Sequence, residues 1–121
     1  MAYSPAPRRG DIIRVRLDPV VGSEQAGSRP ALVVSPDLIN ESGPLVLIAA
    51  ITSKKTERAY PFEVVIEPPE GGLTRRSKVM LMHLRSIDKQ RLAGRYGAVG
   101  QETMNRVERA IMIATGLIKV D

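Results

Sequence analysis

The pattern of apolar and polar positions changes once along the chain, from short apolar runs to a longer helical repeat. The runs have the length of strands and are bounded by Gly, Pro, Asn or Asp, which predicts strands. In the first run the apolar Ile13 and Val15 alternate with charged residues, as in a strand with one wet face. The five expected strands cover residues 12–17, 31–35, 45–51, 62–66 and 78–87.

The last segment of the chain has a different period. Apolar residues recur at helical spacing from Gln101 onwards, which predicts an amphipathic C-terminal helix. These residues are Met104, Val107, Ile111, Ala114 and Ile118. Shorter helical turns are expected at residues 37–40 and after Asp88, whose side chain can cap one.

This order of elements predicts one small domain that is mainly β with helices, an α+β protein. Several short strands before one terminal helix suggest a strongly bent, SH3-like β-barrel with the amphipathic helix attached. Residues 1–9 carry two prolines and no periodicity, so we expect a flexible N-terminal tail. The domain is then expected to cover residues 10–121.

Composition narrows the classes of partner. The net charge of +5, from 18 Lys and Arg against 13 Asp and Glu, favours a polyanion such as nucleic acid or an acidic protein segment. The chain has no cysteine and no apolar run of about 20 residues, so we expect a cytoplasmic protein without membrane contact. With a single histidine and no nucleotide-binding glycine loop, neither a metal nor another cofactor is expected.

Candidate chemistry begins in the loop GSEQAGSRP at residues 22–30. Glycines at both sides permit unusual backbone angles, and Pro30 biases Arg29 towards an extended conformation at the start of a strand. The Arg29 guanidinium can bind two phosphoryl oxygens and stabilise the charge that develops in phosphate chemistry. The alternative is a surface ion pair between Arg29 and Glu24.

A second candidate segment is AAITSK at residues 49–54, where an apolar strand ends in two hydroxyls and a basic run. Thr52 can hydrogen-bond a non-bridging phosphate oxygen, or it can end the strand by bonding local backbone. The third segment is MHLRSIDKQRL at residues 82–92. It contains His83, expected to bind beside the reacting phosphate rather than to catalyse, and Arg85, expected to form an ion pair or a phosphate contact.

Together the three segments resemble the MazF/PemK (Kid) family of toxin endoribonucleases, in the family's order and over about residues 9–118. The resemblance implies the SH3-like barrel of the MazF/Kid/CcdB type, with Arg29 and Thr52 as the catalytic pair. We expect Glu24 as a further catalytic candidate, either accepting a proton or orienting Arg29 and the substrate. The expected RNA-binding residues are Ser23, Gln25, Ser53, Lys54, Lys55, His83 and Arg85.

The resemblance also implies a function. Family members are toxins of type II toxin-antitoxin systems that cleave single-stranded mRNA at specific sequences without a metal. The chain is therefore expected to leave 2′,3′-cyclic phosphate and 5′-hydroxyl ends, to form a homodimer, and to bind an acidic, MazE-like antitoxin. Surplus apolar residues in the C-terminal helix fit a dimer contact. They are Met112, Ile113 and Leu117.

Two departures from the family bear on mechanism. Glutamine is common where this chain has His83, and some branches carry an Arg-x-Asp catalytic pair where it has Met80 and Met82. A gyrase poison of the CcdB type is a rival interpretation, but the chain lacks the Trp-Gly-Ile terminus of that toxin. A homologue that binds RNA or a protein partner without cleaving is the other alternative.

Overall fold

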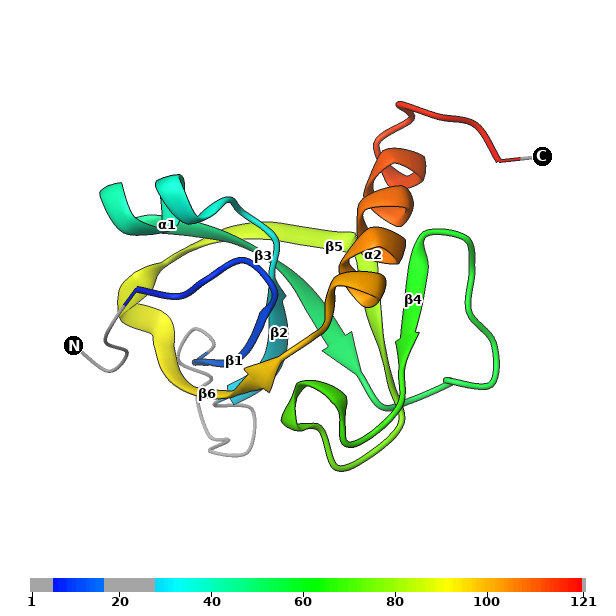
Figure 1. Ribbon diagram of the computed structural model, residues 1–121, viewed down its shortest axis with the longest axis horizontal. Helices are drawn as coiled ribbons and strands as arrows, with labels where there is room; N and C mark the ends of the chain where they lie inside the picture. The colour runs from blue at the N-terminus through cyan, green and yellow to red at the C-terminus, as the bar shows by residue number, and fades with distance from the viewer. Residues whose placement is uncertain (1–5, 17–27, 121) are drawn as a thin grey trace, which may run out of the picture.

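The computed structural model describes residues 6–16 and 28–120, which form one bent antiparallel sheet with two α-helices and two short 3-10 turns (Figure 1). The six strands are paired in the order β4-β5-β3-β2-β1-β6. The strands are β1 (Asp11–Arg16), β2 (Ser28–Val33), β3 (Leu45–Thr52), β4 (Glu63–Ile66), β5 (Ser77–Asp88) and β6 (Leu92–Ala98). The helices are α1 (Asp37–Ser42) and α2 (Gln101–Ala114), and the turns are η2 (Glu70–Gly72) and η3 (Lys89–Arg91).

The mainly β class is confirmed, and all five predicted strands are present within a few residues of their expected limits. In the described residues the pairing order is open, with β4 and β6 at its ends. The finer description as an SH3-like barrel therefore stays a prediction.

The sixth strand, β6, was not expected from the sequence. Its composition, LAGRYGA, lacks the apolar alternation of the other strands. Packing explains it, because a Cβ on Gly97 would lie 2.7 Å from the carbonyl carbon of Gly71, so the strand and the η2 turn touch through their backbones. A close contact of this kind leaves no periodic signal in the sequence.

A register shift in the longest strand bends the sheet. β5 pairs with β3 at both of its ends, but Ala49 lies opposite Leu84 while the next residue, Ala50, lies opposite Met80. Residues 81–83 thus have no partner on β3 and form a bulge, which increases twist and bends a strand. The first half of β5 also pairs with β4, so this strand joins the two parts of the sheet.

Apolar side chains fill both faces of the sheet, as the alternation in β1 illustrates. Ile12 belongs to the cluster beneath α2, whereas Ile13 belongs to a cluster on the other face. The helix α2 packs on β4 and β5, and Met104 and Val107 are among its buried residues. About 25 cal/mol for each Å² of apolar surface removed from water favours this arrangement.

The C-terminal helix begins where the spacing predicts but ends earlier. Gly116 adopts a left-handed φ of +79°, and the Leu117 amide donates to the Met112 carbonyl at 2.8 Å. These features end a helix, because glycine accepts the left-handed conformation at little cost. Ile118 therefore lies beyond α2, although its spacing continues the apolar stripe.

Both predicted short helical turns are present. The α1 helix includes residues 37–40, and the Asp88 side chain caps η3 by accepting from the Gln90 amide at 2.8 Å. The expected tail is partly attached to the domain, because Arg8 lies 3.2 Å from the Asp37 carboxylate and Arg9 lies 2.9 Å from that of Glu108. Residues 1–5 lie outside the described part. Across residues 6–16 and 28–120, each helix is too short or too polar to span a membrane.

Candidate active site

Two neighbouring strands bring the predicted catalytic pair to one place. The ladder between β2 and β3 pairs Val33 with Ile48 and ends with Ala31 opposite Ala50. Arg29 and Thr52 each lie two residues beyond that last pair, on opposite strands, and both line a cavity of about 270 Å³. The register of the sheet therefore places Arg29 and Thr52 at the same cavity, although they are 23 positions apart in the chain.

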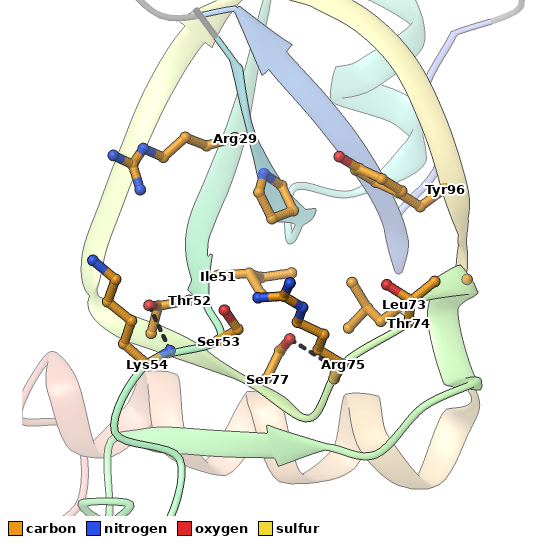
Figure 2. A pocket seen from close by; sticks show the side chains of 12 residues that line it. Arg29, Ile51, Thr52, Ser53, Lys54, Leu73, Thr74, Arg75, Ser77 and Tyr96 are labelled. Atoms are coloured by element: carbon orange, nitrogen blue, oxygen red, sulfur yellow. Dashed lines mark hydrogen bonds between the residues drawn. The ribbon is translucent and has the colours of Figure 1, made fainter. Parts of the chain in front are cut away.

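The cavity has two walls, one from the ends of the strands and one from loops (Figure 2). Arg29 and Lys54 lie on one side of the view and Tyr96 on the other, and the Arg75 side chain reaches between them. The described residues that line it are Arg29, Pro30, Ile51, Thr52, Ser53, Lys54, Gly72, Leu73, Thr74, Arg75, Ser77 and Tyr96.

Arg29 is exposed and well anchored through its backbone. It pairs with Val15 of β1 and is followed by Pro30, which fits the extended conformation that the sequence predicts. Within residues 6–16 and 28–120 its side chain makes no ion pair or hydrogen bond. The guanidinium therefore has its donors available for a ligand in the cavity.

Thr52 makes one of the two contacts that the sequence left as alternatives, and the other stays a prediction. Its hydroxyl oxygen accepts a hydrogen bond from the Lys54 amide at 3.1 Å, so it does end the strand on local backbone. A hydroxyl that accepts still carries a proton that it can donate elsewhere. The bond orients the oxygen and leaves that proton free to meet an anion.

The loop wall contains residues that sequence reasoning missed. Arg75 is exposed and lies between η2 and β5, where the Ser77 hydroxyl donates to its carbonyl at 3.0 Å. The glycine before this segment is required, because Gly72 has a φ of +77° and a Cβ there would lie 2.0 Å from the Tyr96 carbonyl oxygen. A signal was available in the run TRRSK at residues 74–78, which mixes hydroxyls and cations as residues 52–55 do.

The described lining of the cavity is positively charged. Arg29, Lys54 and Arg75 contribute three positive charges, and no carboxylate is present among the described lining residues. Charges in a concave surface focus their field, which raises the local concentration of anions. The same part of the chain brings no three His, Cys, Asp or Glu residues together as a metal site. The described lining therefore suits an anionic ligand.

Two further cavities adjoin the first. One of about 80 Å³ shares Arg29 and Pro30 with it and is also lined by Arg85. The other, of about 600 Å³, shares Thr52 and Lys54 and is also lined by Lys55. The predicted binding residues Ser53, Lys54, Lys55 and Arg85 therefore lie in or next to the main cavity.

Four predicted site residues are not placed there. His83 is exposed in the bulge of β5 and is not among the residues that line these three cavities. Ser23, Glu24 and Gln25 lie outside the described residues, so their roles stay predictions.

Comparison with known proteins identifies the family of the chain. Residues 8–115 match the family described as the PemK-like, MazF-like toxin of type II toxin-antitoxin systems. The chain therefore belongs to the PemK/MazF toxin family, and the resemblance seen in its sequence is confirmed.

Individual relatives cover nearly the whole chain. The endoribonuclease EndoA of Bacillus subtilis (strain 168) is 40% identical over 111 residues, which are 92% of this chain and 96% of the relative. A solved MazF from Deinococcus radiodurans is 30% identical with a TM-score of 0.73, covering 93% of this chain and 99% of its own. A mycobacterial endoribonuclease solved with its cognate antitoxin is 28% identical with a TM-score of 0.76, covering 95% and 100%.

Proposed function

We propose that this chain is the toxin of a type II toxin-antitoxin system and cleaves single-stranded mRNA at specific sequences. Its family consists of endoribonuclease toxins, and EndoA is a relative at 40% identity. The observation that carries the proposal is the convergence of Arg29 and Thr52 on a cavity that has three cations and no carboxylate among its described lining residues. A phosphodiester is the anion that this chemistry fits best.

The proposed reaction uses the nucleophile of the substrate. The 2′-hydroxyl of the RNA loses its proton and attacks the adjacent phosphorus, the bond to the 5′-oxygen breaks, and that oxygen takes up a proton. In net terms one proton passes from the 2′-oxygen to the 5′-oxygen. The products are a 2′,3′-cyclic phosphate and a 5′-hydroxyl. Arg29 stabilises the charge on the pentacoordinate phosphorus, and the Thr52 hydroxyl donates to one of its non-bridging oxygens. These steps need no metal.

The adjoining cavities give the RNA a path on both sides of the reacting phosphate. Arg85 lies beside Arg29, whereas Lys55 lies beyond Thr52 and Lys54. We propose that these cations hold neighbouring phosphates, because phosphate contacts set the register of a nucleic acid on its protein. Glu24 and His83 stay secondary candidates for proton transfer and base contact.

We also propose that the toxin is a homodimer that binds an acidic antitoxin. Near the end of α2, Met112 is 36% exposed and Leu117 is 74% exposed, which leaves apolar surface for a second copy. The antitoxin segment would lie on the same cations as RNA, so the two should compete. A monomeric mass by light scattering at micromolar concentration would count against the dimer.

One experiment tests the cleavage chemistry. The purified protein is incubated with a long RNA in EDTA, and the new 5′ ends are mapped. We expect cuts at a recurring sequence with 5′-hydroxyl ends, and no cut where the nucleotide before the bond carries 2′-deoxyribose. The Arg29→Ala protein is the control for contaminating nuclease. Cleavage of the 2′-deoxy substrate, or strict dependence on added magnesium, would rule out the proposed mechanism.

A further inference from the structure

We propose that Lys78 and Glu63 form a clamp that holds the β3–β4 loop, residues 53–62, in the position that binds RNA. The loop carries Lys54 and Lys55, which line the cavities on either side of Thr52. Lys78 is thus a positioning residue that acts through the loop. The effect on RNA rests on the proposed function, whereas the effect on the loop does not.

The clamp is a buried ion pair. The Lys78 ammonium lies 2.9 Å from the Glu63 carboxylate, and their side chains are only 7% and 9% exposed. Removing one partner of such a pair leaves an uncompensated charge, whereas the intact pair adds little stability over apolar residues of the same volume. The pair therefore acts mainly by fixing the position of the groups that it binds rather than by stabilising the fold.

Both members of the pair bind the backbone of the loop. Lys78 donates a second hydrogen bond to the Arg58 carbonyl at 2.9 Å. The Tyr60 amide donates to the Glu63 carboxylate at 3.1 Å, and the Glu63 amide donates to the Tyr60 carbonyl at 2.8 Å. The last part of the loop is thus fastened at both Arg58 and Tyr60, and the Tyr60 ring stacks on Phe62 with centroids 5.3 Å apart.

The clamp lies directly beside the candidate catalytic threonine. Lys78 pairs with Thr52 of β3 on one side and with Val65 of β4 on the other. Paired residues of neighbouring strands share a face of the sheet, and Lys78 and Thr52 both line the cavity of about 600 Å³. Lys78, which anchors the far end of the loop, therefore lies on the strand next to Thr52, the residue after which the loop begins.

The chain contains a matched control pair. Glu67, just after the other end of β4, lies 2.9 Å from Arg76, just before β5. This second pair is exposed: the Glu67 side chain is 64% exposed and the Arg76 side chain 48% exposed. Neither residue lines the three cavities. It has the same chemistry between the same strands without touching the loop.

Limited trypsin digestion and kinetics test the clamp together. The loop contains the trypsin sites Lys54, Lys55 and Arg58. In Lys78→Met we expect about tenfold faster cleavage at these sites, because trypsin cuts segments that open locally. We expect the KM for RNA to rise about tenfold with kcat changed less than about twofold, since the lost contacts serve binding. The Arg76→Met and Glu67→Gln proteins should match wild type in both measurements.

Two further variants keep the test independent of folding. Lys78→Met combined with Glu63→Met removes the stranded carboxylate, so the fold should be retained while the loop stays open to trypsin. Lys78→Arg keeps both donor functions and should recover slow digestion and most of the affinity for RNA.

Three outcomes would overturn the proposal. The first is digestion of the loop at the wild-type rate in the double variant, and the second is faster digestion with an unchanged KM. The third is a loss of activity confined to kcat that follows the fraction of unfolded protein. A wild-type protein that cleaves no RNA would instead overturn the proposed function, and the digestion result would still decide whether the clamp holds the loop.

Discussion

The two walls of the main cavity are held by different means. Arg29 and Thr52 lie at the ends of paired strands, so the β2–β3 register determines their separation. Lys54 and Arg75 lie on loops, which are positioned by individual contacts such as the one between Gly72 and Tyr96. The strand wall is part of the sheet, whereas the loop wall is attached to it.

This difference suggests that one wall serves catalysis and the other serves binding. Catalytic groups need positions that vary little, because small displacements reduce transition-state stabilisation sharply. Groups that attract and hold a flexible polyanion tolerate more movement. We therefore expect changes on the strand wall to affect kcat most strongly, and changes on the loop wall to act more weakly and mainly through binding.

The largest effect is expected at Arg29. In Arg29→Ala the kcat for RNA should fall about 10³-fold, since one charge-stabilising group is removed from the transition state. The melting temperature should stay near that of wild type because the side chain is exposed. Single-turnover cleavage and thermal denaturation measure the two quantities.

Lysine at the same position sharpens this test. Lys supplies the charge but not the planar two-pronged contact, so Arg29→Lys should remain well below wild type. Full activity in Arg29→Ala would remove the catalytic role, and full activity in Arg29→Lys would show that charge alone is needed.

A smaller effect is expected at Thr52. Thr52→Ala removes the hydroxyl that donates to the phosphate and should lower kcat about 10²-fold. Thr52→Ser keeps the hydroxyl and should recover most of the rate. If both variants were equally slow, the methyl group or the strand end would be the important feature rather than the proton donor.

Local patterns mark the two residues of the strand wall in the sequence, whereas their assignment as a catalytic pair comes from the family resemblance. An arginine before proline and a threonine at the end of an apolar run are visible in residues 29–30 and 49–52. On the loop wall, Lys54 was predicted from the basic run after Thr52, but Arg75 was missed because the contacts that place it are between segments distant in the chain. Neither the meeting of Gly72 with Tyr96 nor the presence of β6 follows from any local period.

The position of His83 also depends on contacts that the sequence does not show. His83 is predicted to contact RNA, and the bulge in β5 places it outside the three cavities, so this role stays a prediction. Bulges depend on the register between strands and not on the residues of one strand alone. The buried pair of Lys78 and Glu63 was equally invisible, since each residue by itself looks like a surface charge.

On the loop wall, Arg75 is expected to have an intermediate effect. Arg75→Ala should lower kcat/KM about tenfold, mostly through KM, because one of the three cations that attract the phosphate is lost. Arg76→Ala is the matched control, since this neighbouring arginine pairs with Glu67 outside the cavity. Equal losses in the two variants would mean that net charge matters and the position of Arg75 does not.

The smallest effect is expected at Lys54, an exposed residue at the meeting point of two cavities. Lys54→Glu should slow association with RNA and with an acidic antitoxin peptide about threefold to tenfold at low salt, because it weakens long-range attraction. The difference should shrink at higher salt, where exposed charges are screened beyond about 10 Å. Folding stability should barely change.

Lys119→Glu makes the same change in net charge on an exposed residue away from the cavities and should leave both rates near wild type. Stopped-flow fluorescence measures both associations, and an equal slowing by Lys119→Glu, or a Lys54→Glu effect that ignores salt, would show that the loop wall does not steer its ligands.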